Sequence, residues 1–474
     1  MHRLLVSAAH KSSGKTTVTL GLAAALAAQG TRVQPFKKGP DYIDPMWLAQ
    51  AAGHPCINLD PYLMEDMALE RAFVQAARGA DLALVEGNKG LYDGLALDGS
   101  NSNAALARRL GLPVLLVIDA RGMTRGIAPL LLGYQAFDRH IRIGGVILNR
   151  VGGARHEGKL RAVIEHYTDI PVLGAVAEDP RLAVMERHLG LMPCAELDDA
   201  QERVQAIGRI VAAQVELPRV RDLAASAGPF EATQALWTLP AEPVRAPDLR
   251  IAIARDRAFG FYYPDDLAAL QDAGAELVFF DTLHDAHLPA ADGLFIGGGF
   301  PETCLDALEA NSALREDIRT AIVAGLPTYA ECGGLMYLAR SIRWQGRTAR
   351  MVGAIPGDAV MHARPVGRGY VHLQETAAMP WGGGTEAGAL RGHEFHHSSL
   401  ENLDPGTVFA YRVQRGHGVD GTHDGVCVHN VLASYAHLRT GAGAQWAPRF
   451  VAHVRQQRQR RQAAALEPAA VLAA

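Results

Sequence analysis

At 474 residues the chain is longer than one hydrophobic core usually sustains, so two or three domains are expected. Hydrophobic residues make up 49% and charged residues 20%, proportions that are ordinary for a globular enzyme and exclude an intrinsically disordered chain. The formal net charge of −4 argues against a general nucleic-acid binder, which would be basic, so we expect no nucleic-acid partner.

The cysteines and the apolar runs indicate the compartment. The five cysteines are odd in number and form no C-x-x-C pair, which argues against both a disulfide framework and a zinc ribbon. The start of the chain lacks the layout of a signal peptide, and no apolar run approaches the roughly 18 residues of a membrane span. We therefore expect a cytoplasmic protein with reduced thiols and no membrane partner.

The first half alternates short apolar runs with longer helical patterns. The runs are continuous, as in strands covered on both faces, and lie at residues 3–9, 81–87, 112–120, 143–150 and 171–176. Ala-rich helical patterns, such as residues 16–30, fall between them. This alternation predicts an α/β fold with a mostly parallel, doubly wound sheet over residues 1–214.

The alternation of apolar runs and helical patterns stops after residue 214 and resumes at residue 249. Residues 215–248 contain several prolines and no sustained strand, which predicts a linker. Apolar runs return at 249–256, 276–281, 293–299 and 326–334, so a second α/β domain is expected over 249–454. Residues 455–474 are basic and then Ala-rich, and we expect a solvated, disordered tail there.

"AHKSSGKTT", residues 9–17, follows the first predicted strand and opens a helix. It matches the phosphate-binding pattern G-x-x-x-x-G-K-[ST], except that Ala9 stands at the first glycine. Lys15 and the backbone N–H groups can bind the phosphates of ATP, and Thr16 can ligate Mg²⁺. The predicted ATP-binding residues are Ser12, Ser13, Gly14, Lys15, Thr16 and Thr17.

Two further segments carry charged residues toward the same end of the predicted sheet. Residues 36–45 read as one Gly/Pro-shaped loop with Lys37, Lys38, Asp41 and Asp44. In residues 84–94, Glu86 ends a strand, where it can be a second Mg²⁺ ligand, and Asp93 lies on the loop beyond. Lysines beside aspartates suit an acidic substrate whose carboxylate attacks the γ-phosphate of ATP.

In the second domain, one cysteine lies between an apolar run and a pair of glycines. Cys332, in "LPTYAECGGLMYL", is expected at a turn from strand to helix, where the helix N-terminus would lower the pKa of an exposed thiol. A thioester-forming nucleophile needs two backbone donors for its oxyanion. Gly333 can supply one, and Gly298 or Gly299 of "IGGGFPE" the other. His437 in "VLASYAHLRT" is the candidate base.

"GHEFHHSS", residues 392–399, brings three histidines close together: His393, His396 and His397. The H-E-x-x-H order of zinc hydrolases is absent, and no third-ligand motif accompanies the segment. We therefore favour a strand or loop that lines a glutamine pocket over a metal site.

Taken in order, the motifs "GKTT", "KKGPDYIDP", "VEGNKGLYDG", "GGGFPE", "AECGG", "GHEFHHS" and "ASYAH" resemble the cobyrinic acid a,c-diamide synthases, including those acting on hydrogenobyrinic acid. The resemblance covers residue 1 to about residue 455. It implies a first domain similar to dethiobiotin synthetase and a second similar to class I glutamine amidotransferases.

The resemblance also implies an activity: ATP- and glutamine-dependent amidation of two peripheral carboxylates on a corrin ring, through acyl phosphates and ammonia released at Cys332. The family's substrate and metal positions match Tyr42, Asp44, Asp93 and Glu86, beside Lys15 and Thr16. One departure is at residue 439. The glutaminase pattern H-x-E would orient the histidine through a glutamate, but Arg439 stands there, so the group that orients His437 stays open.

Three alternatives remain. Cobyric acid synthase and nickel-sirohydrochlorin a,c-diamide synthase are the closest, and the "GPDYIDP" and "GLYDG" loops favour an a,c-diamide enzyme over the former. A partner-switching P-loop ATPase would carry a lysine five positions before Lys15, where this chain has His10, and it would leave Cys332 unexplained.

Overall fold

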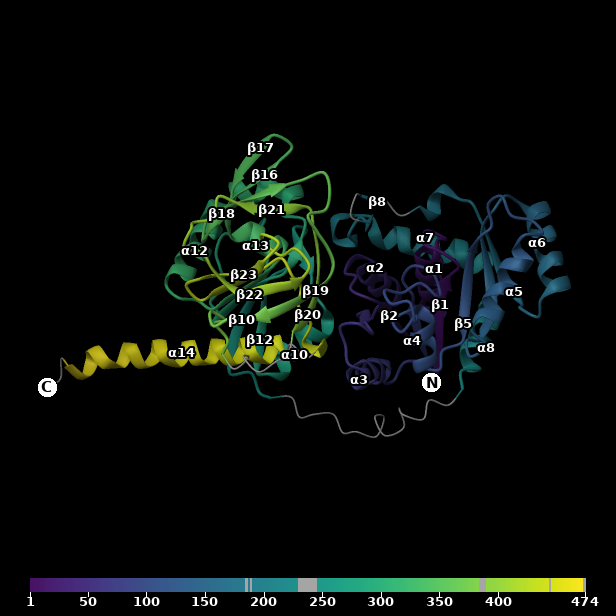
Figure 1. The fold of residues 1–474 in the computed structure, drawn as a ribbon, viewed down its shortest axis with the longest axis horizontal. Helices are drawn as coiled ribbons and strands as arrows, with labels where there is room; N and C mark the ends of the chain where they lie inside the picture. Colours follow the sequence, from purple (N-terminus) through teal and green to yellow (C-terminus); the bar gives the residue numbers. More distant parts are fainter. Residues whose placement is uncertain (184–185, 188–189, 229–244, 383–388, 443–444, 472–474) are drawn as a thin grey trace. The chain divides into compact units, whose positions relative to one another are not determined.

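A computed structural model of the chain describes residues 1–183, 186–187, 190–228, 245–382, 389–442 and 445–471. The chain divides into two compact units, residues 1–240 and 241–474, each with its own sheet (Figure 1). The expected α/β class, with a doubly wound parallel sheet followed by a second α/β domain, is confirmed.

The first unit is built on a seven-stranded sheet in which every pairing is parallel. In spatial order its strands are β3 (Ile57–Leu59), β2 (Val33–Lys38), β4 (Leu82–Glu86), β1 (His2–Ala8), β5 (Val114–Asp119), β6 (Ile143–Val151) and β7 (Val172–Ala177). A two-stranded ribbon, β8 (Glu186–Arg187) and β9 (Gly190–Leu191), lies apart from it.

Helices cover both faces of this sheet, which is why its strands read as continuous apolar runs. One face packs against α3 (Asp66–Ala77), α4 (Asn103–Arg109), α5 (Ile127–Phe137) and α6 (Ala154–Tyr167). The other packs against α1 (Lys15–Ala28), α2 (Ile43–Ala52), α7 (Ala200–Gln214) and α8 (Leu217–Ala225). Leu5 faces the first core while Leu4 and Val6 face the second, as the alternation of a strand requires.

The ordered part of the first unit extends further than the sequence suggested. Helix α8 falls within the stretch 215–248 that we expected to be a linker, and Leu217, Val220 and Leu223 are buried in the core. One side of α8 is apolar and buried, which stabilises the helix. Pro218 does not prevent it, because proline is tolerated in a first helical turn. Residues 229–244 of the predicted linker lie outside the described residues.

The second unit contains a nine-stranded sheet that is parallel in one half and antiparallel in the other. Its spatial order is β12 (Ala275–Phe280), β10 (Leu249–Ala254), β13 (Gly293–Ile296), β15 (Thr328–Glu331), β24 (Val431–Ser434), β23 (His423–Val428), β22 (Val408–Arg415), β19 (Gly367–Glu375) and β20 (Leu390–His396). The antiparallel half was not predicted from the sequence.

Smaller elements complete this unit. A four-stranded sheet contains β17 (Arg347–Arg350), β16 (Ala339–Trp344), β18 (Ile355–Met361) and β21 (Ser398–Glu401), and β11 (Phe259–Phe261) pairs with β14 (Gly298–Gly299). The helices are α10 (Pro264–Asp272), α11 (Leu305–Ala310), α12 (Ser312–Val323), α13 (Gly333–Leu338) and α14 (Trp446–Val471). Buried side chains of α11, α12 and α13 join one core, and those of α10 and α14 join another.

Helix α14 extends into the segment 455–474, where we expected a disordered tail, and it ends at Val471. Trp446, Phe450 and Val454 anchor its first turns in the core. Further along, Arg455 donates to Asp248 at 2.7 Å, so the basic run begins as a docked helical face.

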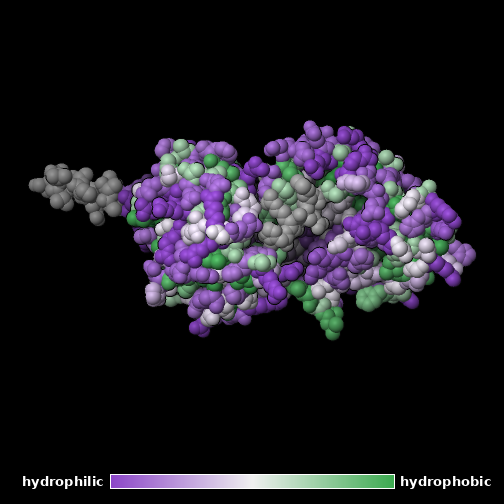
Figure 2. Space-filling model, turned by 90° about the horizontal axis from the view of Figure 1, so that it is seen from above, coloured by the Kyte–Doolittle hydropathy of each residue, from purple (hydrophilic) through white to green (hydrophobic). Residues whose placement is uncertain are grey.

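Most of the surface seen in Figure 2 is hydrophilic, and hydrophobic residues form small, scattered patches on it. Among the described residues, no helix combines the length and apolarity needed to cross a bilayer.

Candidate active sites

The phosphate-binding loop connects the carboxyl end of β1 to α1. Gly14 has φ +85°, and a Cβ there would lie 2.0 Å from Asn149 Nδ2, so only glycine fits. Residues of β6 hold the loop: Asn149 Nδ2 donates to Ser13 O at 2.8 Å and Arg150 Nη1 donates to Ser12 O at 2.9 Å. These contacts engage two carbonyls of the loop, which leads into the first turn of α1, where N–H groups without intrahelical partners can bind a phosphate.

A compact polar cluster lies beside this loop. Thr16 Oγ1 donates to Glu86 Oε1 at 2.7 Å and lies 3.4 Å from Asp44 Oδ2. The ammonium of Lys37 contacts Asp44 and also Glu86 Oε1, the latter at 2.8 Å. The register of the sheet explains the contact between Lys37 and Glu86, because these residues pair directly across the neighbouring strands β2 and β4.

The cluster corrects the assignment of residues 36–45 to a single loop. Lys37 and Lys38 are the last residues of β2, and Asp44 lies in the first turn of α2. Asp44, expected at the substrate, lies beside the two expected metal ligands, Thr16 and Glu86. Only Asp41 belongs to the turn between them, where its Oδ1 accepts the N–H groups of Ile43 and Asp44.

Charge and burial explain how this cluster titrates. Burial alone would lower the pKa of Lys37, but Asp44 and Glu86 outweigh burial and raise that pKa well above its ordinary value. Burial and the neighbouring Asp44 carboxylate raise the pKa of Asp41 to about 7. Burial also lowers the pKa of Lys15, and Lys37 adds to the effect. An anion that binds here would therefore contact two lysines, Lys15 and Lys37, whose local environments differ.

The same residues fit a Mg²⁺ ion. Three oxygen donors, from Thr16, Asp44 and Glu86, converge on one point, and Mg²⁺ takes oxygen ligands. Glu86 Oε2 is buried without a hydrogen-bond partner, so the carboxylate has coordination capacity to spare. The ammonium of Lys37 shows that a cation is accommodated there.

The two other predicted substrate residues lie on segments that adjoin elements of the cluster, α2 and β4. Tyr42 is the residue before α2 and is buried. Asp93 Oδ2 accepts the N–H of Gly90 at 2.9 Å and so closes the turn after β4. A Cβ on Gly90 would lie 2.6 Å from Ala9 O, so this turn packs directly against the start of the phosphate loop.

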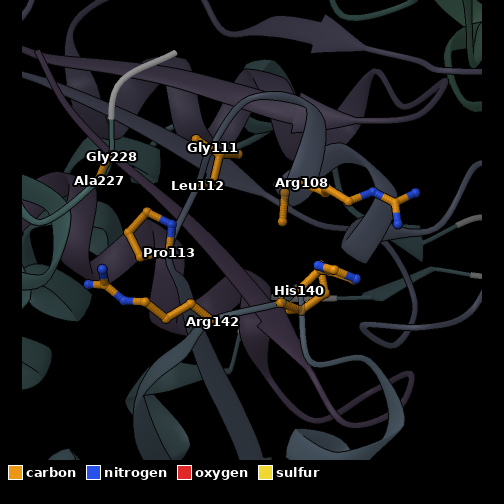
Figure 3. Close-up of a pocket in the computed structure, with 10 residues that line it drawn as sticks. Arg108, Gly111, Leu112, Pro113, His140, Arg142, Ala227 and Gly228 are labelled. Carbon is orange, nitrogen blue, oxygen red and sulfur yellow. The ribbon is translucent and has the colours of Figure 1, made fainter. Parts of the chain in front are cut away.

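The cavity in Figure 3 is not part of this site. It has a volume of about 190 Å³ and is lined by residues that precede β5 and β6, such as Pro113 and Arg142. In a parallel sheet the amino ends of strands lie opposite their carboxyl ends, where the phosphate loop is. Arg142 also donates to Ser226 O at 3.0 Å, so it caps the end of α8.

In the second unit, Cys332 occupies the sharp corner between β15 and α13. Its φ of 47° and ψ of −99° are unfavourable for a residue with a side chain, and its N–H donates to Ser434 O at 2.7 Å. A strand-to-helix turn at the candidate nucleophile is therefore present. Burial, with Glu302 adding to it, raises the pKa of the Cys332 thiol, so the expectation of an exposed thiol with a lowered pKa is wrong.

The glycines expected at the oxyanion site lie around this corner. A Cβ on Gly333 would lie 2.9 Å from the backbone nitrogen of Gly299, and a Cβ on Gly298 would lie 2.7 Å from His437 Cε1. The structure thus brings together Gly298, Gly299, Gly333 and His437, although the first and the last of them are 139 positions apart in the sequence.

Two acidic residues that sequence reasoning missed hold His437. Glu331 Oε2 lies 3.1 Å from His437 Nδ1. Asp424 accepts from Ser434 Oγ and from the N–H groups of Tyr435 and Ala436, which fixes the segment leading to the histidine. Glu331 could have been noticed in "AECGG", whereas Asp424 in "HDGV" carries no motif.

His393 and His396 of the histidine-rich segment lie on β20, and His397 lies between β20 and β21. The imidazole of His393 stacks on that of His437, with centroids 4.9 Å apart and planes at 21°. Burial lowers the pKa of His393 well below its ordinary value, so this neighbour stays neutral. No group of three His, Cys, Asp or Glu side chains in the described ranges is arranged to hold a metal ion.

Family models match a large part of each unit. A model described as an AAA domain matches residues 2–186, and one described as a CobB/CobQ-like glutamine amidotransferase domain matches residues 250–444. An ATP-using P-loop domain joined to a glutamine amidotransferase domain defines the class: a ligase that takes its nitrogen from glutamine.

Curated relatives narrow the class to a family. The cobyrinate a,c-diamide synthase of Magnetococcus marinus is 46% identical, covering 94% of this chain and 96% of that protein. Those of Methanosarcina acetivorans and Synechocystis sp. are 42% and 39% identical, covering 92% and 94% of this chain and 92% of each relative. The chain belongs to the cobyrinate a,c-diamide synthase family, and the resemblance seen in its motifs is confirmed.

Proposed function

We propose that this enzyme converts the a- and c-carboxylates of cobyrinic acid or hydrogenobyrinic acid to amides, using ATP and glutamine. The observation that carries the proposal is the presence of two candidate sites in one chain. One is the oxygen and lysine cluster beside the phosphate loop. The other is the Cys332 corner with its glycines and histidine. The curated relatives named as cobyrinate a,c-diamide synthases support the substrate.

Ammonia would be released in the second unit. The Cys332 sulfur attacks the carboxamide carbon of glutamine, and the backbone N–H groups of Gly333 and of Gly298 or Gly299 bind the oxyanion. Burial raises the pKa of the Cys332 thiol and so favours its protonated form, and His437 would accept the proton during attack. His437 then gives that proton to the leaving ammonia, and water hydrolyses the glutamyl thioester to glutamate.

Activation of the corrin would occur in the first unit. A carboxylate oxygen attacks the γ-phosphorus of ATP, ADP leaves, and ammonia displaces phosphate from the resulting acyl phosphate. Ser12, Ser13, Gly14 and Thr17 would bind the nucleotide phosphates together with Lys15. When bound, Mg²⁺ would offset phosphate charge, with Thr16, Asp44 and Glu86 as its protein ligands.

Lys38 is the residue best placed to bind a substrate carboxylate. Lys37 is already committed to Asp44 and Glu86, whereas Lys38 Nζ donates to the neutral side chain of Asn88 at 3.1 Å. Burial lowers the pKa of Lys38 to about 8, with the Asp60 carboxylate opposing this effect, so Lys38 is charged at neutral pH. Tyr42 and Asp93 would shape the same substrate region.

We further propose that the enzyme works in the cytoplasm on small molecules alone. No disulfide bond joins two cysteines among the residues that the structure describes, in keeping with a reducing compartment.

A product assay tests the proposal. The enzyme is incubated with ATP, Mg²⁺ and glutamine, with cobyrinic and hydrogenobyrinic acid in separate tubes, and the products are weighed by mass spectrometry. An ATP-dependent gain of two amides on either corrin is expected. Amidation of neither would overturn the proposed substrate, and nickel-sirohydrochlorin would then be tested as the acceptor.

A further inference from the structure

Glu331 is the last residue of β15 and directly precedes Cys332. Its side chain is buried, and both carboxylate oxygens are occupied. Oε1 accepts the hydroxyl of Tyr329 at 2.6 Å and the N–H of Leu438 at 3.1 Å, while Oε2 lies 3.1 Å from His437 Nδ1. The carboxylate thus binds the imidazole of His437 and the backbone of the next residue together.

The residue that would orient the histidine in an H-x-E pattern points to another partner. Arg439 Nη2 donates to Asp265 Oδ2 at 2.6 Å, and its guanidinium lies 4.9 Å from the centre of the Tyr263 ring. Its side chain is fully buried in this arrangement. Position 439 therefore ties the chain to α10, and the carboxylate facing His437 Nδ1 comes from β15.

We propose that Glu331 is the positioning residue of the glutaminase site: it fixes the proton on His437 Nδ1, leaves Nε2 as the basic nitrogen, and stabilises the imidazolium formed when Cys332 attacks. The inference rests on the proposed glutaminase step. A carboxylate only accepts hydrogen bonds, so Nδ1 must carry the proton in this contact. The hydrogen bond from Tyr329 keeps the second oxygen engaged, which holds the carboxylate in one orientation.

This arrangement compensates for the buried thiol. A facing carboxylate stabilises an imidazolium by its charge, so Glu331 would help His437 to hold the proton that the buried Cys332 thiol gives up. His393, the other group stacked on His437, is held neutral and adds no opposing charge. Arg439 also lies near, but its charge is directed to Asp265.

The test compares Glu331→Gln and Glu331→Asp with the wild-type full-length chain. Glutamine hydrolysis is measured as kcat and KM across pH, and ATP-dependent amidation is measured with ammonium salt in place of glutamine. We expect Glu331→Gln to lower kcat for glutamine hydrolysis about 10²- to 10⁴-fold with KM nearly unchanged. Glu331→Asp should recover part of the loss, and amidation with ammonium should persist in both.

Glu375→Gln is the matched control, because Glu375 is also a buried carboxylate of this unit but pairs with Arg449, away from His437. It should keep wild-type glutaminase kinetics. Proton NMR supplies a second readout: a strongly downfield His437 Nδ1–H resonance should be present in the wild type and absent from both His437→Gln and Glu331→Gln.

The outcomes separate the two proposals. If Glu331→Gln keeps the wild-type kcat and pH profile, or if the wild-type resonance is missing, the role of Glu331 is wrong while the glutaminase assignment stands. Loss of ammonium-driven amidation in Glu331→Gln would mean a general structural role and would also overturn the inference. A wild-type chain that hydrolyses no glutamine would overturn the proposed function itself.

Discussion

Lys37 and Glu86 form a buried ion pair between adjacent strands, with Nζ 2.8 Å from Oε1 and both side chains nearly inaccessible to water. The ammonium lies where the oxygens of Thr16 and Asp44 also converge. A divalent cation ligated by these oxygens would compete with this ammonium, so Mg²⁺ and the Lys37 contacts are expected to be linked.

Asp44→Asn removes one anionic oxygen from this cluster and a charged partner of Lys37. We expect the Mg²⁺ concentration for half-maximal amidation to rise about 10- to 100-fold, while glutamine hydrolysis is spared. Titration of Mg²⁺ in the amidation assay measures the shift. Asp66→Asn, at an exposed carboxylate in the same unit, should leave the titration unchanged. Selective loss of glutamine hydrolysis in Asp44→Asn would show that the residue has been misplaced.

Cys332→Ala removes the nucleophile but no charge. We expect it to abolish glutamine-driven amidation and to leave amidation with high concentrations of ammonium salt, since the activation site uses none of the thiol's atoms. The two nitrogen sources are compared in the same product assay. Equal inactivity with both would contradict separate glutaminase and synthetase sites.

Gly298→Ala tests the approach of the glycine strand to the base. The new Cβ would lie 2.7 Å from His437 Cε1, closer than such atoms pack, so the imidazole must shift. Because a misplacement of about 1 Å can cost about 100-fold in rate, glutamine hydrolysis should fall by that order. Gly406→Ala is the control, since no atom lies within 4 Å of its added Cβ. Unchanged hydrolysis in Gly298→Ala would place His437 away from the reaction.

Lys38 predicts a pH dependence. Burial lowers the pKa of this lysine to about 8, so its charge is present below that pH and is lost as pH rises through it. If Lys38 binds a substrate carboxylate, KM for the corrin should rise above about pH 8 in the wild type. Lys38→Arg keeps its charge there and should abolish the rise. A wild-type KM that stays flat from pH 7 to pH 9 would exclude this role.

The sequence predicted most of the parallel strands of both sheets and the residues of both motifs, because buried parallel strands and phosphate loops leave local patterns. It did not predict β2, since "VQPFKK" ends in two lysines whose burial depends on carboxylates from other segments, and it also missed the short strands β3 and β24. It also missed the antiparallel strands of the second unit, where half-buried strands such as β22 mix exposed and buried positions irregularly.

The thiol's pKa and the partner of His437 were beyond the sequence for a different reason. The short helix α13 and its glycines suggested an exposed, activated cysteine, but the surrounding core buries every residue from Gly333 to Leu338. Burial then dominates over the effect of the helix N-terminus. The role of Glu331 depends on its pairing opposite Ser434 across β15 and β24, a register that no local pattern records.

Strand β15 is only four residues long, and it carries Glu331 immediately before the cysteine. Side chains on a strand alternate between faces, so a slip of one residue against β24 would turn the carboxylate to the opposite face and withdraw the thiol from its corner at once. The proposed catalytic centre therefore forms only when β15 pairs with β24 in the correct register. A chain that folds with the wrong register would be inactive as a glutaminase even if its cores were filled.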